Sequence, residues 1–190
     1  LEKEEAPTIK LDNYTAGALA ASHLLNLGHR KFACLAGPLK IKICRERFYG
    51  FLDTLEESGI SLREEFIEEG NFKTEEGGKA MNKILSIPLS ELPTAVFSMN
   101  DLMAIGAIQV IKERGLSIPG DISIIGLDNI PFCDIVSPPL TTVAQPFDEM
   151  AKEGINLLLK LIEGKKTRKT IIVIQPKLVI RSSTAPPKKR

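Results

Sequence analysis

Two pairs of polar residues follow apolar runs that have the length and composition of β-strands. Asn100 and Asp101 come directly after a run that begins at Ala95, and Asp128 and Asn129 come after the run that ends at Leu127. Such residues often cap helices or form turns, yet their side chains can also hydrogen bond a ligand. Ligands bind beyond the carboxyl ends of the strands in open parallel sheets, so the two pairs predict a binding site there.

Arg47 and Phe72 extend this hypothesis to two further strand ends. Arg47 lies in the early turns of a helix predicted after the Gly37-Pro38 loop, and Phe72 follows Gly70-Asn71. A guanidinium offers a rigid fork of donors to hydroxyl, carboxylate or phosphate groups. An exposed Phe72 would stack on a sugar face or a planar ring, whereas a buried one would be a core residue. Four such side chains at four strand ends predict one ligand crevice.

The elements that position these residues alternate between strand and helix along the chain. Strands recur about every thirty residues, which is typical of βαβ units with right-handed crossovers. The fold class is therefore α/β, with a doubly wound parallel sheet. Strands are predicted at 8–11, 32–36, near 66–67, 95–99, 122–127, 140–143, 171–174 and 178–180, and helices at about 13–27, from near Cys44 to 58, 74–85, 102–114 and 147–162.

Composition limits the classes of protein to which the chain can belong. The 190 residues include 25 Lys and Arg against 24 Asp and Glu, a formal net charge of +1 that gives no broad footprint for nucleic acid. Three cysteines without a CxxC pair favour a reducing cytoplasm. No run reaches membrane-spanning length. No cofactor loop, nucleophile elbow or zinc spacing is present, so we predict a non-enzyme without cofactor, catalytic residue or metal site.

Several residues with reactive side chains are better explained by structure than by chemistry. His23 lies on the apolar face of its helix, where a hydrogen-bonded core histidine is expected, and His29 is expected to be a surface turn residue. Cys44 lies near a helix start, where a thiol pKa can fall, but an inert thiol is the favoured interpretation. Gly77 and Gly78 are expected to allow close packing of a helix.

Longer motifs resemble the lactose/galactose-repressor (LacI/GalR) family of bacterial transcription regulators over nearly the whole chain. The motifs are RFYGF at 47–51, PTAVF at 93–97 with NDLMAIG at 100–106, GLSIPGDISIIGLDN at 115–129, PPLTTV at 138–143 with QP at 145–146, and LVIRSS at 178–183. In that family a helix-turn-helix headpiece binds operator DNA. A two-subdomain core, similar to periplasmic sugar-binding proteins (type I), binds a small effector in its cleft and dimerises.

The resemblance implies a domain organisation in which this chain is truncated at its N-terminus. The headpiece and most of the N-terminal subdomain would precede Leu1. Residues 1–11 would be a remnant of the N-terminal subdomain and 12–145 the C-terminal, effector-binding subdomain. Residues 146–175 would cross back to the N-terminal subdomain, in agreement with the proline breaks on either side, and 176–190 would return as a tail.

Transferred by motif, the effector contacts of the family fall largely on the residues already selected by position. They would be Arg47, Phe72, Asn100, Asp128 and Gln145. Ile41 stands where some members place a polar contact, so the effector specificity of those members does not transfer. A sugar, a sugar phosphate and a purine all remain candidate effectors, and neither the operator nor the direction of regulation can be predicted.

Two other functions remain as alternatives to a cytoplasmic repressor core with a small-molecule effector. A periplasmic sugar-binding protein for transport shares the architecture, and an enzyme on a doubly wound fold comes third. Operator DNA would be bound only through the missing headpiece. The helix from Leu102 to Ile111 is apolar nearly all round. It needs a second buried contact, either across a homodimer axis or with another helix of the same chain.

Overall fold

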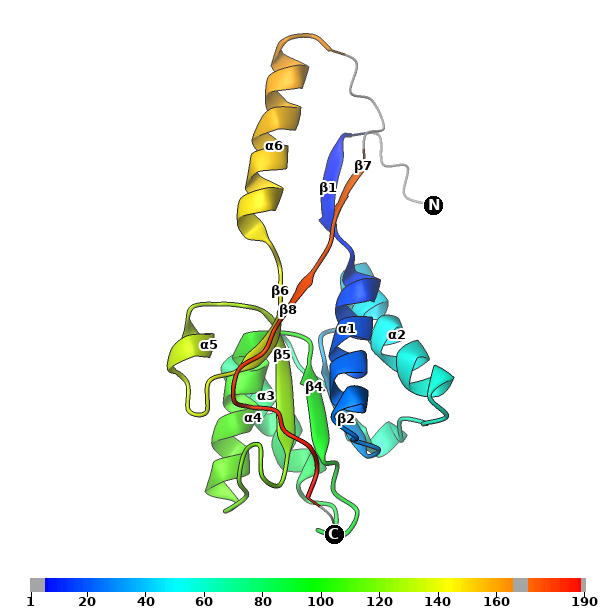
Figure 1. Ribbon diagram of the computed structural model, residues 1–190, viewed down its shortest axis with the longest axis vertical. Helices are drawn as coiled ribbons and strands as arrows, with labels where there is room; N and C mark the ends of the chain where they lie inside the picture. The colour runs from blue at the N-terminus through cyan, green and yellow to red at the C-terminus, as the bar shows by residue number, and fades with distance from the viewer. Residues whose placement is uncertain (1–5, 166–170, 189–190) are drawn as a thin grey trace.

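The computed structural model describes residues 6–165 and 171–188 (Figure 1). The ends of the predicted segments 1–11 and 176–190, and residues 166–170 of the predicted crossover, lie outside these ranges. The elements are β1 (Thr8–Leu11), α1 (Asn13–Asn26), β2 (Phe32–Ala36), α2 (Lys42–Glu57), a 3-10 turn η1 (Glu64–Phe66), β3 (Ile67–Glu69), α3 (Thr74–Ile84), β4 (Ala95–Ser98), α4 (Asp101–Glu113), β5 (Ser123–Asp128), α5 (Phe132–Ile135), β6 (Thr141–Ala144), α6 (Phe147–Ile162), β7 (Ile171–Ile174) and β8 (Lys177–Val179).

The main sheet has six strands in the order β3-β2-β4-β5-β6-β8. The first five run parallel, with Cys34 beside Phe97 and Phe97 beside Ile125, whereas β8 pairs antiparallel with β6. The chain leaves β2 toward β3 at one edge and leaves β4 toward β5 in the opposite direction. The gap between the carboxyl ends of β2 and β4 is therefore the switch point at which ligands bind in such sheets.

Helices cover both faces of the sheet, which confirms the doubly wound α/β class (Figure 1). On one face, Ala16 and Leu24 of α1 and Phe51 of α2 join Phe97 and Leu127 in a fully buried cluster. On the other face, α3 and α4 cover the strand side chains that point the opposite way, namely Leu35, Val96 and Ile124. The near-continuous apolar runs of the central strands follow from this burial on two sides.

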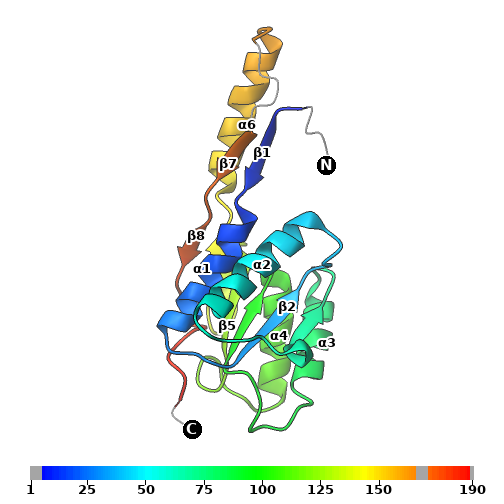
Figure 2. The same cartoon turned by 90° about the vertical axis from the view of Figure 1, so that its right-hand side faces the viewer.

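A smaller unit stands apart from the main sheet, at the end where the parallel strands finish (Figures 1 and 2). It consists of the parallel pair β1 and β7, with α6 alongside. Three segments join it to the larger unit, at Asp12, at Gln145-Pro146 and at Gln175-Pro176. On α6, Ile155, Leu158 and Ile162 are exposed, so much of the apolar face of this helix is uncovered in the chain.

Predicted and observed elements differ mainly at their ends. The second helix starts at Lys42, so Cys44 and Arg47 lie in its first two turns, as predicted; its N-cap Ile41 makes no side-chain hydrogen bond. Asp128 is the last residue of β5 rather than the first residue after it, since its main chain still pairs with Ala144.

The prediction that His29 is a surface turn residue was wrong. Its side chain is 1% exposed and lies between Thr94 Oγ1 and the Ala185 carbonyl, each 2.9 Å from a ring nitrogen. The C-terminal segment folds back over this position and covers it, a contact that local sequence does not encode. His23 is half-buried and hydrogen bonded to Thr184 Oγ1, as expected for a histidine on an apolar helix face.

Helix α3 covers much of the second apolar face of α4. A Cβ atom on Gly77 would meet the Met103 carbonyl, so the glycine permits the close approach of the two helices, as predicted. Ile108 and Val110 are buried, while Leu102 remains 39% exposed. Of the two explanations for this apolar helix, packing within the same chain therefore accounts for most of it.

Candidate functional site

The candidate site lies at the switch point, where β2 and β4 finish side by side. The Gly37 amide, just after β2, donates to Met99 Sδ, just after β4, over 3.3 Å. This contact joins the two strand ends at the switch point. The segments that follow β2, β3, β4 and β5 begin at this edge of the sheet, and the smaller unit lies beyond the same edge (Figure 2).

Arg47 is held rigidly beside this contact by two hydrogen bonds. Its Nε donates to Asn13 Oδ1 and its Nη1 to the Met99 carbonyl, both at 2.9 Å. A Cβ on Gly17 of α1 would meet the Arg47 carbonyl, so a glycine is required where α1 crosses α2 beside it. The residue is 5% exposed, and burial lowers the pKa of the guanidinium while the charge of Asp128 opposes that effect.

Phe72 and Asn100 meet directly at the next two strand ends. The Asn100 side-chain nitrogen donates to the Phe72 carbonyl over 2.9 Å, and its oxygen accepts from the Met103 amide over 3.1 Å. Asn100 is therefore both a helix cap and the support of the aromatic loop. Phe72 has a φ of 69° and its half-buried ring lies against Gly37, where an added Cβ would be 2.6 Å from ring atom Cε1.

Asp128 completes the polar lining from the end of β5. Its Oδ1 accepts a hydrogen bond of 2.5 Å from Gln145 Nε2, and its backbone has a φ of 124°. Burial raises the pKa of the Asp128 carboxyl to about 6, Gln145 and Arg47 oppose the rise, and Asp101 adds to it. Asp128 and Arg47 form no direct ion pair, and Nε and Nη1 of Arg47 donate to Asn13 and to the Met99 carbonyl instead.

Two further residues belong to the site: Asn13, which the sequence did not point to, and Asp101, which was predicted beside Asn100 but not as an effector contact. The N-cap of α1 is Asp12, which accepts from the Thr15 amide, and Asn13 orients Arg47. Asp101, fully buried, accepts from Thr142 Oγ1 over 2.6 Å and from the Ile130 amide over 3.0 Å. The only signal for Asp101 was its place beside Asn100.

Cys44 and Ile41 lie at the start of α2, close to the crevice. Cys44 is fully buried and burial raises the pKa of its thiol, which agrees with an inert role. Ile41 is 39% exposed, so an apolar side chain borders the site at this loop. Within 6–165 and 171–188, no three His, Cys, Asp or Glu residues are placed to share a metal ion.

The chemistry available in the crevice is recognition by hydrogen bonds and stacking. A half-buried carboxylate, an amide from Gln145, a buried guanidinium and an aromatic ring border one space. A small number of convergent polar groups in an otherwise apolar site is typical of small-molecule binding.

Among the described helices, none is both long and apolar enough to span a membrane.

Comparison with known proteins places this geometry among ligand-responsive regulators. Residues 21–184 match the family described as periplasmic binding protein-like domain. The chain is 40% identical over 180 residues to the HTH-type transcriptional repressor CytR of Escherichia coli and 42% identical over 180 residues to the repressor PurR of Histophilus somni, covering 95% of this chain in both cases. It spans about half of these relatives, 52% and 54%.

Solved structures agree over almost the full length of the chain. A regulatory protein of the LacI family from Chloroflexus aggregans superposes with a TM-score of 0.90 at 32% identity, covering 97% of this chain and 66% of that one. The regulator CelR in complex with cellobiose gives a TM-score of 0.89 at 30% identity, with 96% and 55% covered. A dimeric Lac repressor with a C-terminal deletion gives 0.88 at 31%, with 95% and 64% covered.

Proposed function

Because the chain belongs to the LacI/GalR family of transcription regulators and has its periplasmic binding protein-like domain, we propose that it is the effector-binding core of a bacterial repressor. The observation that best supports this proposal is that four side chains, from four strand ends, lie around one crevice. They are Arg47, Phe72, Asn100 and Asp128, and Gln145 joins them through its hydrogen bond to Asp128. The effector controls operator binding by a helix-turn-helix headpiece outside these 190 residues.

The effector is a small polar ring compound. Phe72 stacks on the ring, Asp128 and Gln145 take hydroxyl or amine groups, and Asn100 and Arg47 bond the opposite edge. Among a sugar, a sugar phosphate and a purine, the geometry favours an uncharged ligand. Two nitrogens of Arg47 are already committed to Asn13 and Met99, and the carboxylate of Asp128 would repel a phosphate nearby.

The effector lies between two subdomains. Residues 12–145 form the C-terminal subdomain, and residues 146–175 together with 1–11 belong to an N-terminal subdomain, with 176–190 returning to the first. The exposed apolar face of α6 supports this division, because an exposed apolar face of that size is normally covered by further structure. This division explains the proposed function, because an effector that contacts both subdomains would set the angle between them.

The repressor is a cytoplasmic homodimer. Leu102 at the start of α4 is 39% exposed, and Phe132 and Ile135 of α5 are 57% and 76% exposed. Asp101, the first residue of α4, accepts from the Ile130 amide in the segment that leads into α5, so the starts of the two helices lie near each other. We place the dimer contact on this pair of helices, which we call the α4/α5 surface.

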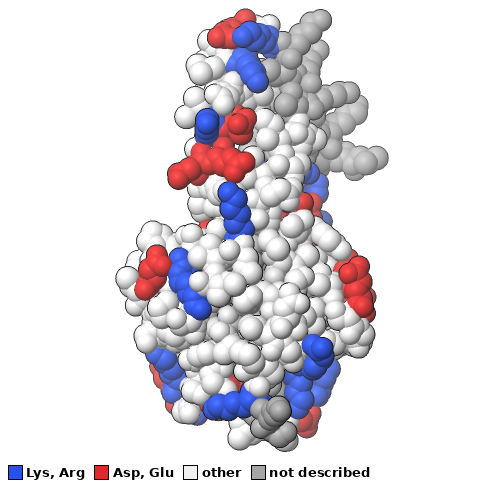
Figure 3. Space-filling model, in the orientation of Figure 1, with Lys and Arg blue, Asp and Glu red and all other residues white. Residues whose placement is uncertain are grey.

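The chain itself neither reads DNA nor catalyses a reaction. On the face seen in Figure 3, Lys, Arg, Asp and Glu side chains are scattered among uncharged residues. The relatives compared above are repressors rather than enzymes. A periplasmic transport role is the alternative, and repression of a reporter gene by the protein in a cell would exclude it as the main function.

The experiment is a thermal-shift screen of the full-length protein against neutral sugars, phosphosugars and purines. A ligand that binds only the native state raises the melting temperature with concentration. We expect a neutral sugar or a purine to do so in the wild type and to lose the effect in Asp128→Asn. No response to any of the three classes would contradict the proposal.

A further inference from the structure

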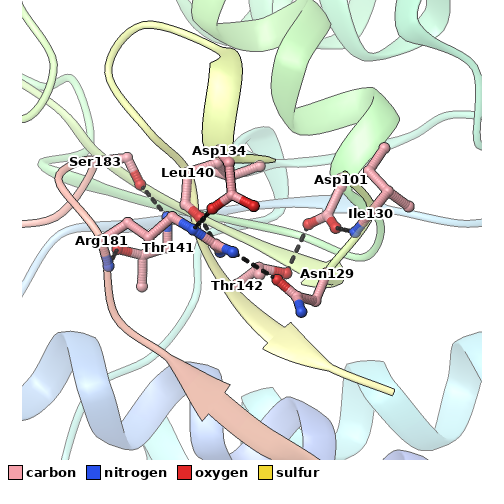
Figure 4. A network of polar contacts seen from close by, with 9 residues as sticks. All are labelled: Asp101, Asn129, Ile130, Asp134, Leu140, Thr141, Thr142, Arg181 and Ser183. Atoms are coloured by element: carbon pink, nitrogen blue, oxygen red, sulfur yellow. Dashed lines mark hydrogen bonds and ion pairs between the residues drawn. The ribbon is translucent and has the colours of Figure 1, made fainter. Parts of the chain in front are cut away.

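Arg181 is the centre of a polar network next to the candidate site, and no role was assigned to it from the sequence (Figure 4). It follows β8, far from the site in sequence. All three of its side-chain nitrogens are used: Nε donates to Asp134 Oδ1 over 2.7 Å, Nη1 to the Leu140 carbonyl over 2.9 Å, and Nη2 to Asn129 Oδ1 over 2.9 Å. Its side chain is only 15% exposed.

The Asn129 contact matters because of the backbone conformation on either side of it. Asp128 and Asn129 both have positive φ values, 124° and 63°. Asparagine adopts a φ near 60° readily, whereas 124° is rare for a residue other than glycine and persists only where the surroundings hold it. The next amide, that of Ile130, is bonded to the buried carboxylate of Asp101. The turn is therefore held from one side by Asp101 and from the other by Arg181.

We propose that Arg181 is a positioning residue for the effector site, because its bond to Asn129 fixes the turn that presents Asp128 to the crevice. That this is an effector site rests on the proposed function, whereas the positioning of Asp128 by Arg181 is a property of the protein without ligand. Arg181 acts on Asp128 through Asn129, since each of its three side-chain nitrogens bonds another acceptor.

An arginine suits this position because one side chain donates to three separate acceptors. The planar guanidinium presents its donors in a fixed fork, whereas a lysine ammonium is a point charge that cannot hold three separated acceptors in this geometry. The acceptors come from the end of β5, from α5 and from the segment before β6. One side chain thus ties the site to the helix that we place in the dimer contact.

Two substitutions that keep the net charge test the proposal. Asn129→Gly removes the side-chain acceptor and tolerates the positive φ, so the fold is kept. Arg181→Lys retains the charge and removes the fork. The matched control is Asp134→Asn, which removes an ion pair whose acidic partner is 66% exposed and leaves the Asn129 contact in place.

The measurement is an NMR titration of the Asp128 side-chain carboxyl carbon in the protein without ligand, together with its melting temperature. Gln145, Arg47 and Asp101 face this carboxyl and are unchanged in every variant. In the wild type the pKa is raised to about 6 by burial. When the turn relaxes toward solvent, the pKa falls toward the ordinary value of about 4.

We expect this fall in Asn129→Gly and in Arg181→Lys, and a pKa still near 6 in Asp134→Asn. Folded variants in which Asp128 titrates as in the wild type, with only a lower melting temperature, would overturn the proposal, because Arg181 would then be a structural residue alone. The titration needs no effector, so its failure would leave the proposed function standing. A ligand screen without a hit would equally leave the positioning role intact.

Discussion

Gln145 donates a 2.5 Å hydrogen bond to Asp128 from the point where the chain leaves the six-stranded sheet for α6. The carboxylate at the end of β5 is thereby linked to one of the three segments that connect the two units. A ligand that donates a hydrogen bond to this carboxylate either competes with Gln145 or binds beside it. Recognition in the crevice is in this way coupled to the connection between the units.

Replacement of Asp128 by Asn should weaken effector binding without unfolding the protein. The shape is preserved and the charge is lost, which removes a charge-assisted hydrogen bond worth roughly 1.5–3 kcal/mol, or about ten- to a hundredfold in affinity. Calorimetry with the compound found in the screen measures the change. Asp134→Asn, at an exposed position outside the crevice, is the control and should bind normally.

Effector affinity should depend on pH around the raised pKa of Asp128, about 6. A ligand that donates to the carboxylate binds the ionised form, so affinity should increase as the pH rises through this value and level off above it. Calorimetry at several pH values between 5 and 8 would follow the change. A flat profile would show that the carboxylate does not contact the ligand.

The same raised pKa predicts a pH effect on stability. The folded pKa lies above the unfolded value, so the proton bound to Asp128 stabilises the fold fully at low pH, and this contribution is lost as the pH rises through about 6. The amide side chain of Asp128→Asn does not titrate, so the variant lacks this pH-dependent contribution to stability. The melting temperature of the wild type should therefore fall relative to that of the variant between pH 5 and 7.

Loss of Asn13 should destabilise the protein and misplace Arg47. Asn13→Ala removes the acceptor for Arg47 Nε in a position that is 6% exposed. An unsatisfied buried donor costs about 1–3 kcal/mol. Urea unfolding measures the change. If the free energy of unfolding stays at the wild-type value, Arg47 is held by the Met99 carbonyl alone.

A charge on the α4/α5 surface should dissociate the dimer. Ile135→Asp places a carboxylate at a side chain that is 76% exposed in the single chain and buried in the proposed contact. Sedimentation of the full-length variant at micromolar concentration should show monomer where the wild type shows dimer. Tyr49→Asp, at a 50% exposed position of α2, serves as the control. A variant that still sediments as a dimer would place the contact elsewhere.

Local sequence was sufficient for the elements and for most of the candidate site. Strand runs and helix caps predicted β4, α4 and β5, and the convergence of parallel strand ends then placed Asn100 and Asp128 at one edge. Both residues lie at the end of a helix or strand, where the type of residue gives a local signal. The alternation of strands and helices along the chain also predicted the doubly wound class.

What the sequence did not predict depends on contacts between distant segments. Arg181 meets Asn129 across 52 positions, and His29 meets Ala185 across 156. No periodicity or capping rule links such pairs, because residues so far apart in sequence are brought together only by the tertiary fold. Asn13 was missed for a related reason: its role comes from the helix packed against it, not from its own neighbours.

The most direct test is to map the binding site of the compound from the screen by amide chemical shifts in the isotope-labelled protein. We predict that the largest changes fall on Gly37, Phe72, Asn100 and Asp128, at the carboxyl ends of β2, β3, β4 and β5. Changes confined to the outer groove between α3 and α4, at Gly78 and Gly106, with the crevice unaffected, would contradict the account.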